Sequence, residues 1–287
     1  MMVALVLGAS GATGRFLLPR LLEAGHDVVA LSRRPRAGHH ARLRWAVGDL
    51  DALMPDLPTL DAIFSLGPLD ACARWFMRAR VAGRPRLVGL SSMSAQTKRD
   101  STDPRERDLA QRLGHAEQTL GEIADQRGCV WTLLRPTLIY GSGTDRSLSP
   151  IARLAMRWRV FPRLVGARGL RQPVHADDLA AACLASFVQP RSAGRNYALG
   201  GGERLRFDAM LERVRASLPV RTLPLPIPLG VVRTLAGIAP RLGLPALHAA
   251  MIERLTQDLV ADHGAAIADF GWAPRGFHPD AQTWRPC

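Results

Sequence analysis

Lysine and cysteine are scarce in this 287-residue chain. Lys98 is the only lysine, so 37 of the 38 basic side chains are arginine, and the net charge is +13. The four cysteines, Cys72, Cys129, Cys183 and Cys287, stand far apart, without CxxC spacing or neighbouring histidine pairs. This pattern is typical of a reducing compartment, and it predicts neither a disulfide nor a bound metal.

Long apolar runs are also missing. The apolar run at 223–229 could be taken for a membrane segment, but it contains three prolines and is soon followed by Arg233. It therefore falls well short of the roughly 20 residues that a bilayer-spanning helix needs. Residues 1–7 lack the basic start and long apolar segment of a secretory signal. We therefore expect a cytoplasmic protein without a transmembrane segment, and the sequence leaves a peripheral membrane contact open.

The basic charge does not have the arrangement of a nucleic-acid-binding protein. Such proteins gather Lys and Arg along one helix or arm, whereas the arginines here run through the whole chain, with short pairs such as Arg33-Arg34. We expect no nucleic-acid partner. With 47% hydrophobic residues, the chain can bury one large core, or a cofactor domain with a smaller companion.

Short apolar runs alternate with helical patterns over the first 140 residues. Strands separated by helices predict an α/β fold, a Rossmann-type doubly wound parallel sheet. The expected strands are at 3–7, 28–31, 43–47, 62–66, 87–90 and 131–134. The expected helices are at 12–24, 69–82 and 104–127.

The pattern is looser after residue 141. We predict a cofactor-binding Rossmann domain over 1–141 and a mostly substrate-binding region over 142–287, with strands near 171–174 and 197–199 rejoining the first domain. The helices expected in this half are near 148–158, 177–188, 207–217 and 247–259.

A glycine-rich segment, GASGATG at 8–14, directly follows the first strand and opens the first helix. In that context Gly8 permits a sharp turn, Gly11 lets the backbone approach a pyrophosphate, and Gly14 lets helix and sheet pack closely. The helix N-terminus turns free N–H groups and a partial positive charge towards the phosphates. The expected dinucleotide contacts in this loop are Gly8, Ser10, Gly11, Ala12, Thr13 and Gly14.

Ser32, Arg33 and Arg34 follow the second strand, where an NAD-specific protein usually places an acid for the ribose 2′-hydroxyl. Two guanidinium groups favour a 2′-phosphate instead, so NADP(H) is the expected cofactor. The alternative is a pair of solvated loop arginines. Asp49 and Leu50 follow the third strand, where they would meet the adenine, although Asp49 could equally cap the turn at 51–54.

These segments resemble the extended and atypical branch of the short-chain dehydrogenase/reductase superfamily, the NAD(P)-dependent epimerase/dehydratase type. The likeness covers nearly the full length, including a tail at 258–277 with a Gly-Trp-x-Pro turn. The matching segments are GASGATG at 8–14, SRRP at 32–35, GDL at 48–50, LSS at 90–92, LLRPTLIYG at 133–141, VHADDLA at 174–180 and YALGGGE at 197–203.

The resemblance implies further site residues. By position, Ser92 would be the active-site hydroxyl. The further cofactor contacts, at the ribose and around the nicotinamide, would be Leu66, Gly67, Pro68, Ser91, Pro136 and Ile139.

The chain departs from that family at the Tyr-x-x-x-Lys pair, which belongs on the helix at 104–127. Aligning this helix on its Ala-Glu pair places Leu109 and Leu113 at the two positions, and a shift of two residues gives Gln111 and His115. The chemistry needs a phenol that exchanges a proton with the substrate oxygen, beside a cation that lowers its pKa. Neither alignment supplies that pair.

Three side chains are candidate catalytic substitutes. Ser92 could donate a hydrogen bond to a carbonyl, but a serine at a strand end often caps the next turn. His115 has a pKa suited to acid–base work, but a lone histidine on a helix face is often solvent-facing. Tyr140 could approach the nicotinamide or pack in the core.

A hydrolase is not expected. His175, Asp177 and Asp178 suggest a triad with Ser92, but the simpler account is that an aspartate caps the following helix while His175 ends a strand. The segment around Ser91 and Ser92 also lacks the glycine that a nucleophile elbow needs two residues after its serine.

The sequence thus predicts an NADP(H)-dependent oxidoreductase or epimerase-like protein with a non-standard proton donor. Its substrate would be a small, rather apolar carbonyl or hydroxyl compound. The alternative is a catalytically inactive NADPH-binding sensor or structural protein that binds a protein partner. We expect a monomer or homodimer.

Overall fold

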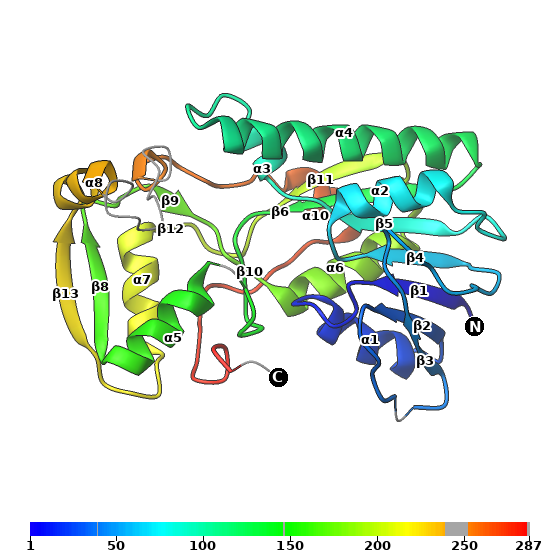
Figure 1. The fold of residues 1–287 in the computed structure, drawn as a ribbon, viewed down its shortest axis with the longest axis horizontal. Coiled ribbons are helices and arrows are strands. Elements are labelled where there is room, and N and C mark those ends of the chain that lie inside the picture. The colour runs from blue at the N-terminus through cyan, green and yellow to red at the C-terminus, as the bar shows by residue number, and fades with distance from the viewer. Residues whose placement is uncertain (39, 146, 239–251, 286–287) are drawn as a thin grey trace.

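The computed structural model describes residues 1–38, 40–145, 147–238 and 252–285. A seven-stranded, wholly parallel sheet has the strand order β11-β6-β5-β4-β1-β2-β3 (Figure 1). This confirms the predicted Rossmann-type α/β fold. The strands are β1 (Val3–Leu7), β2 (Asp27–Ser32), β3 (Leu43–Val47), β4 (Ala62–Ser65), β5 (Arg86–Leu90), β6 (Trp131–Pro136) and β11 (Arg195–Leu199).

Helices cover both faces of this sheet, which is why its central strands are apolar throughout. Ala4 and Val6 of β1 face a core shared with α1 (Gly14–Glu23) and α6 (Ala176–Val188). Leu5 and Leu7 face a second core shared with α2 (Leu69–Arg78) and α4 (Pro104–Gln126). Alternate residues of a strand point to opposite faces, so both sets are buried.

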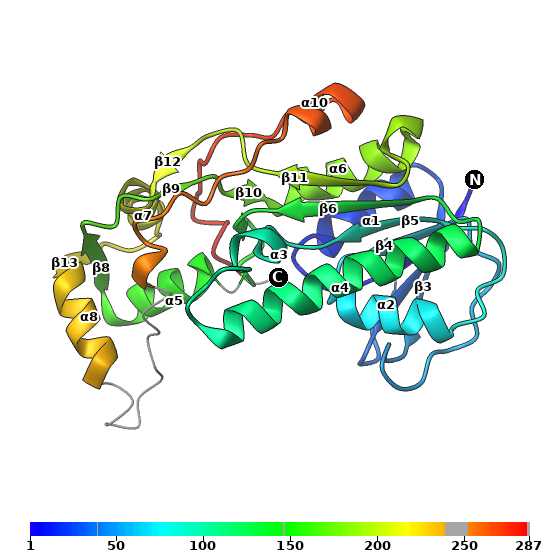
Figure 2. The ribbon, with the colours of Figure 1, turned by 90° about the horizontal axis from the view of Figure 1, so that it is seen from above.

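The other end of the elongated molecule is a smaller lobe (Figure 2). Its core includes Phe161, Met210 and Trp284. Its main elements are α5 (Leu148–Trp158), β8 (Val160–Val165), α7 (Phe207–Ala216), β13 (Leu223–Pro228) and α8 (Leu229–Ile238). Three two-stranded sheets complete the described strands: β13 with β8, β10 (Val174–His175) with β7 (Ile139–Tyr140), and β12 (Leu205–Arg206) with β9 (Leu170–Arg171).

The strand expected near 171–174 does not rejoin the central sheet. The segment is split into β9 and β10, which pair with strands outside it. Pro173 lies at the break and has no N–H to donate to a ladder. The stretch expected at 197–199 lies within β11, beside β6.

The helix expected near 247–259 falls partly outside the described residues. Residues 252–253 are helical, and the chain then turns. Leu259 N donates to Leu170 O at 2.9 Å, so this part bridges to β9 instead. Long-range pairing has overridden a local helical pattern here. Among the described residues, no helix is both long and apolar enough to cross a membrane.

Candidate cofactor and active site

The loops that follow β1 and β4 meet at the centre of the sheet. Gly8 has φ +76°, and a Cβ atom there would lie 2.7 Å from Gly67 N and 2.9 Å from Leu66 C. Only glycine fits this left-handed, crowded position. Strand order reverses between β1 and β4, and in such sheets the crevice at the reversal is where ligands bind.

The start of α1 is shaped to receive an anion. A Cβ atom on Gly14 would lie 2.5 Å from Gly8 O and would also contact Ala9 O. The helix therefore approaches the strand as closely as the sequence predicts, because Gly14 has no side chain. The backbone N–H groups of Ala12 and Thr13 have no acceptor among the described residues. Backbone donors at a helix N-terminus suit a pyrophosphate. The loop therefore fits the phosphates of a dinucleotide.

The arginine pair lies at the carboxyl end of β2. Ser32 Oγ accepts a hydrogen bond from Arg34 N at 3.3 Å and shapes the turn. Arg33 and Arg34 are exposed, and within the described parts of the chain neither guanidinium has an ion-pair partner. Asp27 lies at the opposite end of β2. The position at which the sequence predicts contact with a ribose 2′ substituent thus carries cations and no acid.

Asp49 caps the turn after β3, as the alternative interpretation held. Its Oδ1 accepts from Asp51 N at 3.0 Å. The loop is tied to α2, because Arg74 pairs with Asp51 and Arg78 donates to Leu50 O at 3.0 Å. Asp49 and Leu50 therefore belong to a braced loop beside the expected adenine position.

Ser91 and Ser92 have different hydrogen-bonding states. The Ser91 hydroxyl donates to Glu117 of α4, whose carboxylate is only 5% exposed. Ser92 Oγ instead accepts from Ser94 N at 3.1 Å and starts α3 (Ser94–Thr97), a short helix that the sequence reading missed. Among the described residues the Ser92 proton has no acceptor. Ser92 therefore caps a turn through its oxygen, and its hydroxyl proton can still donate a hydrogen bond.

Glu117 also pairs with Arg135 of β6, and this buried pair was not found from the sequence. Arg135 Nε donates to Glu117 Oε1 at 2.9 Å, and Nη2 donates to Oε2. A charge pair buried with hydrogen bonds on both oxygens fixes α4 against the sheet. Arg135 stands in the LLRPTLIYG segment that the sequence singles out, but nothing in the sequence identifies Glu117 as its partner.

The face of α4 that would carry the missing catalytic pair is apolar. Leu109 and Leu113 are partly buried there, and His115 is exposed on the helix. Both tyrosines of the chain are committed elsewhere. Tyr197 donates to Asp269 at 2.6 Å, and Tyr140 packs in the core.

Tyr140 is 1% exposed, and its hydroxyl donates to Gly276 O at 3.2 Å. Its ring packs edge-on against His175 and Phe277. Burial raises the pKa of Tyr140 to about 12. This surrounding matches the core-tyrosine alternative rather than a proton donor at the nicotinamide.

The turn between β6 and β7 lies next to Ser92. Met93 N donates to Pro136 O at 3.1 Å. Ile139 pairs with Val174 in the small β7–β10 sheet. Pro136 is thus brought beside the segment that carries the candidate hydroxyl, while Ile139 follows on the same turn.

His175, Asp177 and Asp178 form no triad with Ser92. The N-cap of α6 is His175 itself, whose Nδ1 accepts from Asp177 N at 3.1 Å, so expecting an aspartate as the cap was wrong. Asp177 instead forms ion pairs with the guanidinium groups of Arg20, at 2.6 Å, and Arg275, at 2.7 Å. Asp178 also pairs with Arg275.

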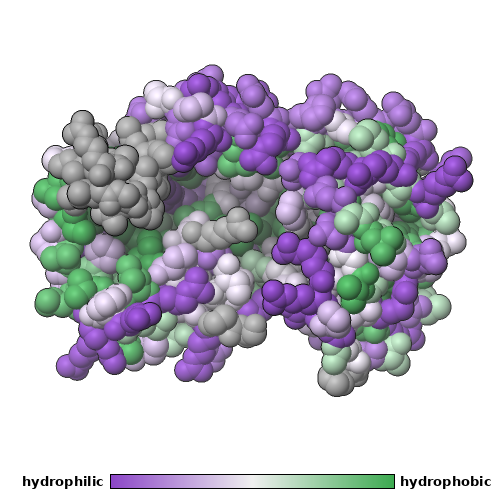
Figure 3. All heavy atoms as spheres, viewed as in Figure 1, coloured by the Kyte–Doolittle hydropathy of each residue, from purple (hydrophilic) through white to green (hydrophobic). Residues whose placement is uncertain are grey.

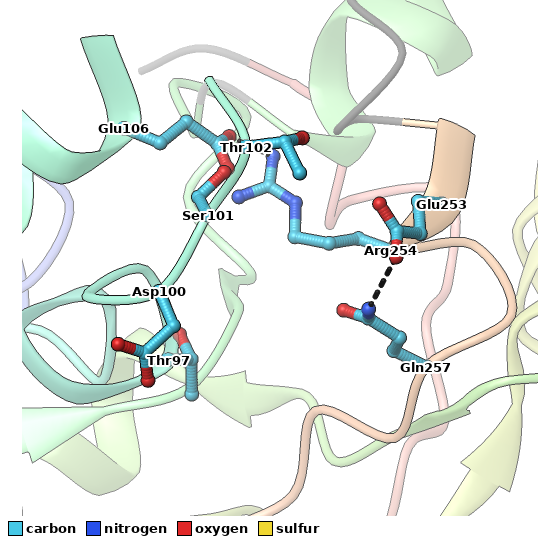
Figure 4. Close-up of a pocket in the computed structure, with 8 residues that line it drawn as sticks. All are labelled: Thr97, Asp100, Ser101, Thr102, Glu106, Glu253, Arg254 and Gln257. Atoms are coloured by element: carbon cyan, nitrogen blue, oxygen red, sulfur yellow. Dashed lines mark hydrogen bonds and ion pairs between the residues drawn. The ribbon is translucent and has the colours of Figure 1, made fainter. Parts of the chain in front are cut away.

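A polar cavity of about 180 Å³ lies beyond α3, where the two halves of the chain meet (Figure 4). Arg254 lies 2.5 Å from Glu106 across it, and Lys98 lies 3.4 Å from the same carboxylate. The lining residues are Thr97, Asp100, Ser101, Thr102, Glu106, Glu253, Arg254 and Gln257. The ion pair between Arg254 and Glu106 therefore joins the two halves of the chain at this cavity.

The metal-ligating residue types are dispersed. Within the described ranges, no three His, Cys, Asp or Glu side chains come together as a metal site would require. Cys72, Cys129 and Cys183 are free and buried.

Comparison with known proteins indicates a nicotinamide dinucleotide cofactor. Residues 8–148 match the protein family described as NAD(P)H-binding. The chain is 25% identical to the 2-alkyl-3-oxoalkanoate reductase of Stenotrophomonas maltophilia, over 96% of this chain and 95% of that protein. It is also 25% identical, over 74% of its length, to the mitochondrial NADH dehydrogenase (ubiquinone) 1 alpha subcomplex subunit 9 of Dictyostelium discoideum. The chain spans 63% of that subunit's length.

Solved structures share the fold. MoeE5 in complex with UDP-glucose and NAD superposes with a TM-score of 0.72 at 20% identity, covering 98% of this chain and 96% of that one. The fold therefore extends over both halves of the chain.

Proposed function

Because residues 8–148 form an NAD(P)-binding domain of the type found in oxidoreductases and epimerases, we propose that the protein is an NADP(H)-dependent oxidoreductase. The observation that carries this proposal is the crevice where Gly8 meets Gly67, with an arginine pair and no acid at the end of β2. Its substrate is a small carbonyl or hydroxyl compound.

The chain's own groups would hold NADP(H) in two places. The free N–H groups of Ala12 and Thr13 meet the pyrophosphate. Arg33 and Arg34 would make charge-assisted hydrogen bonds to the 2′-phosphate. When bound, a nicotinamide cofactor would supply or take up a hydride.

Ser92 is the group proposed to orient the substrate. Its hydroxyl proton is uncommitted, whereas that of Ser91 is held by Glu117. A hydrogen bond from Ser92 polarises a carbonyl and stabilises the negative charge that develops on its oxygen. Serine does not ionise near neutral pH, so the proton finally taken up comes from water.

The expected substrate is apolar around its reacting carbonyl. In one of the two alignments, Leu109 and Leu113 take the positions of the family's tyrosine and lysine, and both are partly buried on α4. The similarity to a 2-alkyl-3-oxoalkanoate reductase supports a ketone that carries an alkyl chain. Partly buried leucines on α4 favour contact with such a chain over a sugar.

A second candidate function is an NADPH-binding protein without turnover. It is favoured by α4, which offers neither phenol nor ammonium, and by the burial of Tyr140 and Tyr197. The similarity to a subunit of NADH dehydrogenase supports a role within an assembly. In that case the cofactor would stabilise the fold or report redox state to a partner.

Titration of the protein's fluorescence with NADPH and NADH tests the cofactor assignment. We expect tighter binding of NADPH, and loss of that preference by about tenfold or more in Arg33→Ala/Arg34→Ala, since each charge-assisted bond contributes about 1.5–3 kcal/mol. Arg80→Ala, an exposed arginine after α2, is the matched control. Equal affinity for both cofactors would contradict the NADP(H) assignment.

Turnover separates the two candidate functions. NADPH consumption with 2-alkyl ketones and 3-oxo acids, reduced in Ser92→Ala, supports the oxidoreductase. Tight NADPH binding without consumption across aldehydes, ketones and sugar nucleotides favours the non-catalytic role.

A further inference from the structure

The net charge of +13 is concentrated in two segments of the chain. Residues 146–176 and 213–252 contain twelve arginines and no aspartate or glutamate. The rest of the sequence is nearly balanced, with a net charge of +1. The arginines are spread along the chain, but the acids that would neutralise them are absent from these two stretches.

Most of the described parts of these segments lie together at one end of the molecule, whereas Val174 packs in the core of the parallel sheet. They include α5, β8, β13 and α8, at the far end from β3 (Figures 1 and 2). The neighbouring α7 does carry acids, but Asp208 and Glu212 are each paired with an arginine, Arg206 and Arg215.

Of the twelve arginines, Arg213 and Arg215 are ion-paired and Arg171 is buried. This end still presents an excess of positive charge, because other arginines are exposed there: Arg153, Arg157, Arg159, Arg163 and Arg221.

Large apolar side chains are exposed on the same elements. Leu154 and Trp158 of α5, one helical turn apart, are 57% and 64% exposed. Leu223 and Leu225 of β13 are 69% and 50% exposed. Figure 3 shows hydrophobic side chains at this end of the molecule, over β13 and α5, interrupted by hydrophilic ones. Exposed apolar groups gathered at one place mark an interaction surface.

The edge of β13 excludes one kind of partner. Leu223 N donates inward to Arg159 O at 2.8 Å. Pro224, Pro226 and Pro228 alternate with the inward donors, so the outer edge of the strand has no N–H group to offer. Another β-strand therefore cannot add to the β13 edge of this sheet by regular pairing.

We propose that this end of the molecule, formed by α5, β8, β13 and α8, binds the surface of an anionic lipid bilayer. Arginines meet the negative headgroups, and the exposed leucines and Trp158 enter the boundary between headgroups and acyl chains. The Arg157 guanidinium lies 5.6 Å from the Trp158 ring. Both side chains combine an apolar body with a polar tip, which suits that boundary.

Other occupants fit the surface less well. A second copy would bring one cationic face against another, and like charges repel. A nucleic acid would match the arginines, but it would gain nothing from Leu223, Leu225 and Leu154. Only a surface that is both anionic and apolar matches the two observations together.

Co-sedimentation with vesicles tests the proposal on the full chain. The probes are vesicles of phosphatidylcholine alone and of phosphatidylcholine with about one third phosphatidylserine. We expect binding to the anionic vesicles only, weakened by high salt because headgroup attraction is screened. The NADPH titration of each variant reports whether it is folded.

Two variants probe the two parts of the surface. Leu223→Ser/Leu225→Ser removes apolar contact, and Arg157→Glu/Arg221→Glu reverses charge. We expect each to lower vesicle binding by about tenfold or more, since each change removes groups that contact the bilayer. Arg44→Glu/Arg80→Glu, which reverses two exposed arginines of the Rossmann domain, is the matched control and retains most of the binding.

Three outcomes overturn the proposal. One is no sedimentation with anionic vesicles at low salt. Another is an equal loss in the control pair, which would indicate attraction by net charge alone. The third is a concentration-dependent dimer that Leu223→Ser/Leu225→Ser abolishes, which would assign the surface to a second copy.

Discussion

Arg135 on β6 donates hydrogen bonds to both carboxylate oxygens of Glu117 on α4, and the distance from Nε to Oε1 is 2.9 Å. The pair is almost fully buried, with side-chain exposures of 14% and 5%. Glu117 Oε1 also accepts a hydrogen bond from the Ser91 hydroxyl. One buried carboxylate thereby joins the sheet, the α4 helix and the strand end that carries the candidate active-site serine.

Glu117→Ala is therefore expected to destabilise the fold severely. It leaves the Arg135 cation buried without a partner, which typically costs about 3–5 kcal/mol. Urea unfolding measures the loss. Glu117→Met/Arg135→Met, which removes both charges, should recover much of that stability. A single variant as stable as the double would show that the pair is not energetically coupled.

Gly8→Ala is expected to abolish cofactor binding. The added methyl group would lie 2.7 Å from Gly67 N and would push the β4–α2 turn away from the glycine loop. Gly25→Ala is the matched control, because Gly25 has a similar φ of +75° with nothing within 4 Å of the added Cβ. We expect both to lose about 1 kcal/mol or more from backbone strain, and only Gly8→Ala to lose NADPH binding, measured by fluorescence titration.

Leu109→Tyr/Leu113→Lys is expected to raise turnover on any ketone the protein reduces. It installs a phenol and an ammonium four residues apart on α4, where the resemblance places a proton donor. General acid catalysis contributes about 10²–10⁴-fold in favourable cases, so a tenfold rise is a conservative expectation. Leu109→Phe/Leu113→Met, which changes shape without adding a donor, should give no rise. Equal rates in both variants would show that the proton donor lies elsewhere.

Tyr140→Phe is expected to leave turnover unchanged. The hydroxyl is buried and donates to Gly276 O, so its loss removes a structural hydrogen bond that contributes about 0.5–1.5 kcal/mol. A lower melting temperature with the same kcat is the expected result. A fall in kcat at unchanged stability would restore Tyr140 as a catalytic candidate.

Stability is expected to fall as pH drops below about 6.5, in part through His175. Burial, and next the charge of Arg275, lower the pKa of His175 below its ordinary value of 6.5 in the folded state. Between these two pKa values the unfolded chain binds more protons, so acid favours unfolding. Thermal melts from pH 7.5 to 5.5 measure the trend.

The matched control for that measurement is His175→Asn. Asparagine can accept the N-cap hydrogen bond from Asp177 N but does not titrate. The variant should keep the stability of the parent at pH 7.5 and lose less of it at pH 5.5. An identical slope in both proteins would assign the pH dependence to other groups.

The sequence by itself determined the elements whose signals are local. β1 and β3 lie at the predicted residues, and α5 has its predicted bounds, because strand alternation, apolar runs and helical spacing are read within a few neighbours. The glycine loop was recognisable for the same reason, since its three glycines and the start of the following helix lie within seven residues. The arginine pair after β2 was likewise visible from its place in the chain.

Tertiary structure alone decided the features that depend on distant partners. Glu117 meets Arg135 from another element, Arg275 reaches back to Asp177, and the segment after 252 pairs with β9 instead of remaining helical. The gathering of acid-free segments and exposed leucines at one end also follows from folding. Such contacts arise when chain segments far apart in sequence are buried together, and no local pattern specifies which buried charge will find which partner.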